Sequence, residues 1–113
     1  MKMVIAFIKE NKFEEVMLAL HKIDGLTGAS SSKVSGFGRD RSKQVPQQKQ
    51  EISLDFKPHV RLDIACHSNL VGQVVSAIKQ AAYTGLQGDG KIYVLPVEES
   101  IRIRTGERGE NAV

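Results

Sequence analysis

Two clusters near the end of the chain have the composition of a phosphate-binding site. Residues 88–91 read Gly-Asp-Gly-Lys, and residues 101–107 contain Arg102 and Arg104, two positions apart. Glycine lets the backbone approach a bulky anion, lysine supplies a compact charge, and arginine supplies a planar fork for phosphate oxygens. If residues 101–104 form a strand, both arginines point to one face about 7 Å apart and the isoleucines face the core. The clusters predict a site for a di- or triphosphate. The alternative is a solvated edge strand and an ordinary glycine-rich turn.

Other site patterns are incomplete in this sequence. Residues 85–91 approach the phosphate-loop pattern, but Ile92 occupies the position at which that pattern needs a magnesium-binding Ser or Thr. The Gly-x-Gly of residues 36–38 lacks the third glycine and the following helix of a dinucleotide-binding fold. No pattern brings a nucleophile, a base and an orienting group together, so we predict that the protein is not an enzyme.

The composition is that of an ordinary globular domain. The chain has 113 residues, 41% hydrophobic and 26% charged, which predicts one domain over residues 1–113. No apolar run approaches the roughly 20 residues that span a bilayer, and we expect a cytoplasmic protein. A net charge of +3 with only 5% aromatic residues argues against nucleic-acid binding. The lone Cys66 excludes an internal disulfide and is expected to be a buried hydrophobe, and the three dispersed histidines predict no metal site.

Hydrophobic spacing predicts the first half of the fold. Residues 2–8 are apolar on both faces, which is typical of a central strand. Apolar residues at helical spacing follow, and we expect Asn11 to cap this helix and Gly25 to stop it. A second strand is predicted over residues 29–37.

The second half repeats this pattern after a long polar loop over residues 38–50. A strand is predicted over residues 51–66, with a bend or an edge position at Pro58. A helix capped by Ser68 or Asn69 is expected to end near Gly85, and the last strand covers residues 91–97.

The order β-α-β-β-α-β is that of an α+β, ferredoxin-like sandwich, with both helices on one face of an antiparallel sheet. Because residues 2–8 are apolar on both sides, the other face needs a cover that a single chain lacks. We therefore predict a homo-oligomer.

Several motifs together resemble the PII signal-transduction family, in order and at matching spacing. They are Gly36-Phe37-Gly38-Arg39, Thr84-Gly85, Gly88-Asp89-Gly90-Lys91-Ile92-Tyr93-Val94, Pro96-Val97-Glu98 and Ile101-Arg102-Ile103-Arg104-Thr105-Gly106-Glu107. The resemblance covers the whole chain apart from one extra residue near Asp24 and Gly25. It implies a ferredoxin-like homotrimer with an adenine nucleotide (ATP, ADP or AMP) in each cleft between subunits.

The resemblance also implies roles for individual residues. Lys91, Arg102 and Arg104 would hold the phosphates, with the backbone of Gly38 and Arg39. Ser30 stands where the family has a threonine that touches adenine. The base and ribose would be lined by Gly36, Phe37, Ala65, Gly88, Asp89 and Gly90.

Residues 38–52 correspond to the loop through which PII proteins contact membrane transporters and enzymes. This loop contains no tyrosine, and Ile52 stands at the position that is uridylylated in many relatives. Relatives that bind 2-oxoglutarate have a glutamine and a lysine where this chain has Asp40 and His59. An aspartate beside a dicarboxylate costs affinity and a neutral histidine removes the countercharge, so the sequence disfavours 2-oxoglutarate sensing.

We therefore predict a regulatory protein that binds adenine nucleotide and controls a partner, a membrane transporter or a protein of carbon metabolism, through residues 38–52. A small anion such as bicarbonate is expected as co-effector, bound by Arg39, Asp40, Arg41 and His59. This expectation of inorganic-carbon sensing rests on resemblance to PII-like proteins associated with carboxysomes. The alternatives are a nitrogen and 2-oxoglutarate sensor, a regulator of a metal-efflux transporter, a weak ATP hydrolase, and a purely structural trimer.

Overall fold

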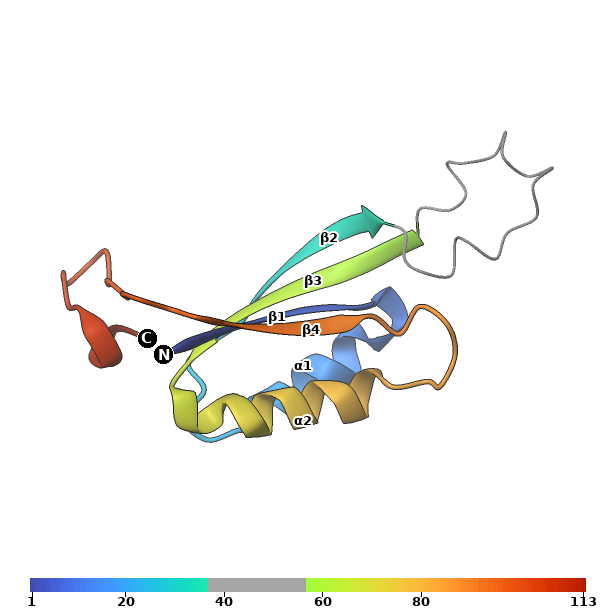
Figure 1. Ribbon diagram of the computed structural model, residues 1–113, viewed down its shortest axis with the longest axis horizontal. Coiled ribbons are helices and arrows are strands. Elements are labelled where there is room, and N and C mark those ends of the chain that lie inside the picture. The colour runs from blue at the N-terminus through green and yellow to red at the C-terminus, as the bar shows by residue number, and fades with distance from the viewer. Residues whose placement is uncertain (37–56) are drawn as a thin grey trace.

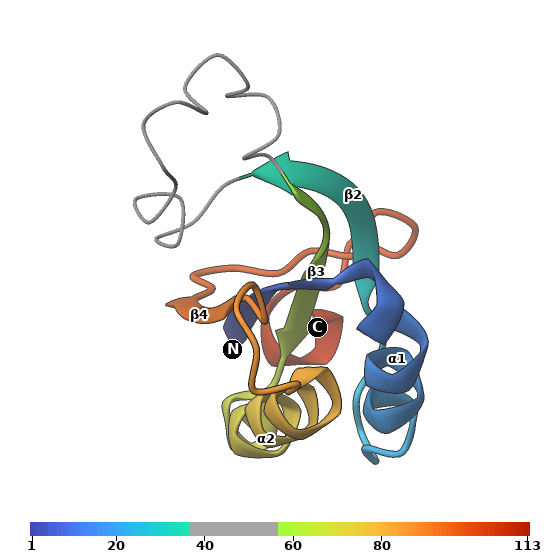
Figure 2. The same cartoon turned by 90° about the vertical axis from the view of Figure 1, so that its right-hand side faces the viewer.

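The computed structural model describes residues 1–36 and 57–113. Its strands form one antiparallel sheet in the order β2-β3-β1-β4, and two helices cover one face of that sheet (Figures 1 and 2). In chain order the elements are β1 (Lys2–Lys9), α1 (Phe13–His21), β2 (Ser30–Gly36), β3 (Lys57–Cys66), α2 (Val71–Ala82) and β4 (Lys91–Pro96). This arrangement confirms the predicted α+β, ferredoxin-like sandwich. The predicted loop over residues 38–50 lies outside the described residues, as do residues 51–56 of the predicted long strand.

The core lies between the sheet and the two helices. Alternate residues of β1 and β3 point toward the helices, and each helix packs one apolar stripe against them. The buried side chains include Val4, Ala6, Ile8, Val16, Leu20, Leu62, Ile64, Cys66, Val74 and Ile78. Cys66 is 2% exposed, and burial raises the pKa of its thiol. The prediction of a buried, apolar cysteine is confirmed.

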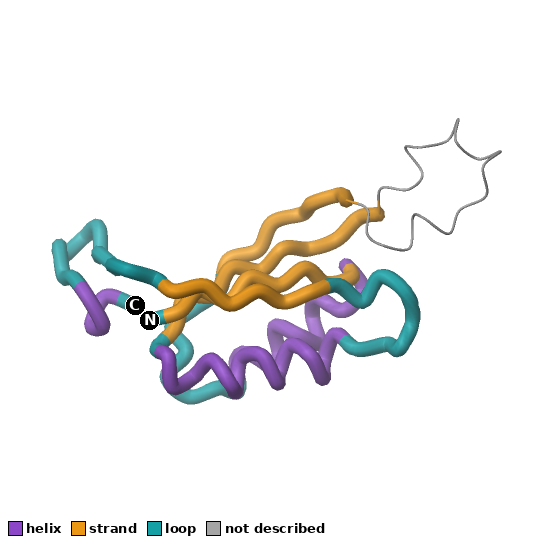
Figure 3. Tube along the Cα trace, in the orientation of Figure 1, coloured by secondary structure: helices purple, strands orange, loops and turns teal. Residues whose placement is uncertain are grey.

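The opposite face of the sheet has no helix in the described part of the chain, as the separation of helices and strands in Figure 3 shows. Phe7 and Tyr93 lie on this face with their rings edge to face, 6.3 Å apart between centroids. The guanidinium of Arg61 lies 5.8 Å from the centre of the Phe7 ring. Tyr93 remains 50% and Leu95 44% exposed, so the single chain leaves apolar surface on this side of its sheet open.

Both helices begin differently from the prediction. The predicted caps, Asn11 and Ser68 or Asn69, are wrong, because each helix is preceded by a 3-10 turn, Glu10–Lys12 or Ser68–Leu70, and no side chain caps it. A 3-10 turn can supply backbone carbonyl partners for N–H groups that a capping side chain would otherwise bind. Both helices also end before the predicted glycines. No helix in the described part of the chain is long and apolar enough to cross a bilayer.

Pro58 occupies the edge position that the sequence predicted. It pairs with Ser35 of β2 on one side, whereas the pairing of β3 with β1 ends one residue later, at His59 and Lys9. Proline lacks a backbone N–H, and here no β1 residue is opposite it. Pro58 can therefore lie in β3 without breaking its pairing to β1.

The segment that follows β4 does not form the predicted strand. Ile101 makes an isolated bridge to Arg108, and the chain turns between them, with Arg102 N–H donating to Glu107 O at 2.9 Å and Gly106 N–H donating to Arg102 O at 2.8 Å. Ile103 is fully exposed, at 102%. The prediction that both isoleucines face the core is wrong because no described strand lies beside this segment to form a sheet with it.

Candidate functional site

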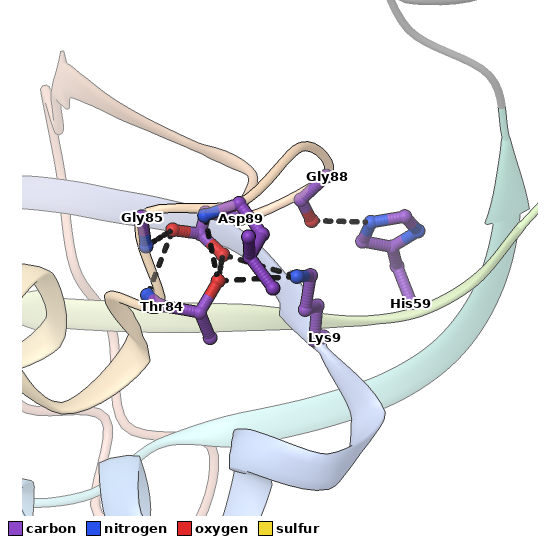
Figure 4. Close-up of polar contacts among 7 residues, drawn as sticks. Lys9, His59, Thr84, Gly85, Gly88 and Asp89 are labelled. Atoms are coloured by element: carbon purple, nitrogen blue, oxygen red, sulfur yellow. Dashed lines mark hydrogen bonds and ion pairs between the residues drawn. The ribbon is translucent and has the colours of Figure 1, made fainter.

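A carboxylate organises the connection between α2 and β4. Asp89 Oδ2 accepts hydrogen bonds from the backbone N–H of Thr84 at 2.8 Å and of Gly85 at 3.0 Å. The Thr84 hydroxyl donates to Asp89 Oδ1, and Lys9 Nζ lies 3.2 Å from the same oxygen (Figure 4). These donors, with the Thr84 hydroxyl as the largest cause, hold the pKa of Asp89 well below its usual range.

Two glycines let this connection close against β1. Gly88 has φ +85° and Gly90 has φ +104°, both in the region that disfavours other residues. A Cβ on Gly90 would lie 1.7 Å from the carbonyl oxygen of Phe7. The turn therefore rests directly on the β1 backbone, and Lys91 begins β4 opposite Phe7 with an exposed side chain.

His59 connects β3 to the same turn. It lies opposite Lys9 in the β1–β3 register. Its Nε2 is 3.2 Å from Gly88 O and its Nδ1 is 3.2 Å from Lys57 O. Figure 4 shows the imidazole reaching the turn beside the group of Lys9, Thr84 and Asp89. Backbone from the turn, the exposed Lys91 and the imidazole thus lie at one end of the sheet, an arrangement suited to anion binding.

Comparison with known proteins identifies the family. The family model described as "Nitrogen regulatory protein P-II" matches residues 1–107. The chain is 43% identical to the nitrogen regulatory protein P-II of Azospirillum brasilense and 45% identical to that of Rhodospirillum rubrum, each over the full length of both chains. It is 41% identical to the nitrogen regulatory protein GlnK of Escherichia coli, also over the full length of both. The chain belongs to the PII family. PII proteins are regulators that act on partner proteins.

In this PII protein the predicted site residues fall into two separate groups. Gly88, Asp89, Gly90, Lys91 and His59 gather at one end of the sheet. Gly36 lies at the same end of β2, opposite Lys57. Phe37, Gly38, Arg39, Asp40 and Arg41 lie outside the described residues.

The second group lies elsewhere in the PII chain. Ser30 is on the edge strand β2, opposite Asp63, and Ala65 pairs with Met3 toward the far end of β1. Arg102 and Arg104 are exposed and belong to the segment after β4, which lies at the end of the sheet away from the 83–90 connection (Figure 1). Within one chain, the structure does not bring these arginines to Lys91.

The sequence patterns did not indicate two residues of this PII site. Lys9 and Thr84 hold Asp89, and their side chains meet at 3.2 Å although they are 75 positions apart in the chain. The signal for Lys9 is its position, because a charged residue there ends an apolar strand. Asp89 makes its described contacts with Thr84, Gly85 and Lys9, so its predicted contact with nucleotide stays a prediction.

Proposed function

We propose that this PII protein is a regulator that binds adenine nucleotide between the subunits of a homotrimer and controls a protein partner through residues 38–52. The observation that carries the proposal is the separation of its cationic residues. Lys91 begins β4 beside the glycine turn, whereas Arg102 and Arg104 follow the other end of β4. The full-length similarity to proteins named nitrogen regulatory protein supports a regulatory role.

The strand geometry explains why two chains are required. Lys91 pairs with Phe7 and Pro96 with Lys2, so β4 runs along the sheet away from the turn. Six strand residues extend about 17–20 Å, and the arginines follow beyond that. The diphosphate group of a nucleoside diphosphate is too short to contact both ends of one β4. A head-to-tail neighbour can supply its arginines to the turn of the next chain.

The open face of the sheet supports the homotrimer. Phe7, Tyr93 and Leu95 present apolar surface on the side without helices. β4 is an edge strand in the described sheet, with β1 as its neighbour. A second and a third copy of this chain are the partners whose surfaces match in composition, since each brings the same apolar face.

The cationic end of the sheet supports an anion as co-effector. Lys9, Lys57, His59 and Lys91 are all located there. We propose bicarbonate as this anion, because it needs fewer countercharges than a dicarboxylate and His59 stands where relatives that bind 2-oxoglutarate have a lysine. Nitrogen regulation through 2-oxoglutarate is the competing proposal, and the names of the relatives support its nitrogen-regulatory part.

Mixed assemblies test the site between subunits. Lys91→Ala and Arg104→Ala are each expected to bind ADP weakly when purified alone. Co-refolded in equal amounts, they are expected to regain about one wild-type site in four, because random cyclic assembly places an intact Lys91 beside an intact Arg104 at that frequency. Calorimetric titration with ADP counts these sites.

Each other outcome is informative. Weak binding by both variants without recovery on mixing places both residues in one chain and overturns the shared site. Normal binding by the separate variants overturns the residue assignment. If the wild-type protein does not bind ADP, ATP or AMP, the nucleotide-sensing proposal is wrong.

A second titration separates the co-effectors. ADP and magnesium-ATP are titrated alone, with bicarbonate and with 2-oxoglutarate. Tighter ADP binding with bicarbonate alone supports inorganic-carbon sensing. Tighter magnesium-ATP binding with 2-oxoglutarate supports the nitrogen sensor and overturns the bicarbonate proposal.

A further inference from the structure

His59 contacts two backbone carbonyl groups from different parts of the molecule. Nδ1 lies 3.2 Å from Lys57 O at the start of β3, and Nε2 lies 3.2 Å from Gly88 O in the glycine turn (Figure 4). Within the described part of the chain these two oxygens are the hydrogen-bond partners of the ring. A carbonyl oxygen only accepts hydrogen bonds, so each contact is a hydrogen bond only when the ring nitrogen carries a proton.

A neutral imidazole has one N–H and the imidazolium has two. Both contacts of His59 can therefore be hydrogen bonds at once only in the protonated ring. The neutral ring leaves one nitrogen lone pair facing a carbonyl oxygen, which is a repulsive arrangement. Histidine is the side chain that ordinarily gains or loses a proton near physiological pH.

Charged residues surround the His59 ring on several of the neighbouring elements in the described structure. Lys9 is opposite His59 on β1, and Lys57 and Arg61 are its neighbours on the same face of β3. The β2 residue opposite it is the uncharged Val34. In the turn, Asp89 binds Thr84, Gly85 and Lys9. Arg61 is bound to Asp63 at 3.0 Å.

We propose that His59 is a positioning residue that joins β3 to the glycine turn when protonated and thereby makes ligand affinity at this turn depend on pH. The inference rests on the proposed function, because the ligand is the adenine nucleotide expected at Gly88, Gly90 and Lys91. The turn carries these groups and sits directly on Phe7 O. A bond from His59 to Gly88 O adds a restraint on the turn from β3, beside those that Lys9 and Thr84 make to Asp89.

The first test reads the contact in the protein without ligand. The ¹³C chemical shift of the Gly88 carbonyl is followed by NMR from about pH 5.5 to about pH 8.5, the interval in which imidazole ordinarily titrates. The shift is expected to follow the protonation of His59 in the wild type and to stay flat in His59→Gln. His21→Gln removes a histidine at the end of α1 and is the matched control, expected to behave as the wild type. A flat Gly88 shift in the wild type overturns the inference.

The second test reads the consequence for binding. ADP affinity is measured over the same pH range, and each variant is compared with the wild type at each pH, which cancels the titration of ADP itself. The wild type is expected to bind about three- to tenfold more tightly than His59→Gln at the acid end, the range of one typical net hydrogen bond, and to lose this advantage at the alkaline end. His59→Arg, a permanent planar cation with several N–H groups, should remove the pH-dependence if it retains the tight binding.

The two proposals fail in different ways. ADP binding with a constant ratio of wild type to His59→Gln across the pH range overturns the role of His59 and leaves nucleotide sensing intact. Failure of the wild type to bind ADP, ATP or AMP overturns the proposed function, and the pH-dependent affinity falls with it. In that case a titrating Gly88 shift would show only the structural contact.

Discussion

The ammonium group of Lys9 lies 3.2 Å from Oδ1 of Asp89, and this ion pair ties the last residue of β1 to the connection before β4. Each side chain is 24% exposed, so the pair is better shielded from solvent than a typical surface salt bridge. The Thr84 hydroxyl lies between them and contacts both. The carboxylate of Asp89 is thus part of the structure of the turn that carries Gly88 and Gly90.

Replacing Asp89 with asparagine is expected to lower the free energy of unfolding by about 2 kcal/mol at neutral pH. The amide keeps one acceptor oxygen but places an NH₂ group against N–H and O–H donors, and it loses the charge that faces Lys9. Urea unfolding at one fixed protein concentration measures the change. Asp24→Asn, at an exposed acid before β2, is the control and should change stability little.

The same pair of proteins has a predicted pH-dependence. Because the folded-state pKa of Asp89 is depressed, its contribution is present above the unfolded value of about 3.9 and is lost as the pH falls through the lower folded value. The stability advantage of the wild type over Asp89→Asn should therefore be constant near neutrality and shrink below about pH 4. An advantage that shrinks near neutral pH instead would contradict this assignment.

Gly90→Ala should be the most damaging single methyl addition in this turn. The new Cβ would meet Phe7 O at 1.7 Å, and the residue would have to keep φ +104°. Strain and overpacking together predict a loss of about 3 kcal/mol or more. Gly72→Ala, in α2 with no atom within 4 Å of the new Cβ, should raise stability by up to about 1 kcal/mol. Equal effects of the two variants would rule out this explanation.

Arg104→Ala is expected to weaken ADP binding by about 1.5 to 3 kcal/mol, as for a lost charge-assisted contact to phosphate. Arg108→Ala is a suitable control, because Arg108 is an exposed arginine of the same segment that bonds to Glu99. Titration calorimetry of both variants under one salt concentration provides the comparison. Unchanged affinity in Arg104→Ala would remove this residue from the site.

Cys66 should report on opening of the core. Its thiol is 2% exposed and has a raised pKa because of burial, so the reactive thiolate is scarce and inaccessible. A thiol reagent is expected to modify the folded protein slower than the urea-unfolded protein by about two orders of magnitude or more. Rapid stoichiometric labelling of the folded chain would show that β3 is open at its end.

Alternation and turn residues were enough to predict the order of elements in this chain. The two-sided apolar pattern of residues 2–8 placed β1 correctly at the centre, and Pro58 indicated the point where β3 extends past β1. Both signals are local. The apolar pattern depends on the face of the strand that each side chain occupies, and the proline signal depends on its missing backbone N–H. The helix starts failed because a 3-10 turn leaves no comparable pattern of capping side chains.

The candidate site was less predictable because its contacts join distant parts of the chain. Lys9 and Thr84 both bind Asp89, and His59 meets Gly88 from a different strand. Spacing along the sequence does not predict contacts between residues so far apart in the chain. The Ile-Arg-Ile-Arg pattern of residues 101–104 has strand periodicity, but periodicity forms a strand only where a neighbouring strand is available.

If Arg102, Arg104 and Lys91 bind one nucleotide together, as we propose, their positions at opposite ends of β4 make the response depend on the concentration of the protein. A ligand that needs all three cations has no complete site on a solitary chain, however abundant the ligand is. Dilution of the protein below the concentration at which its chains associate would then abolish ligand binding. Synthesis of more protein would restore binding without any change in metabolites. The cell's own supply of the protein would become a second input to the signal, set by gene expression and read out by mass action.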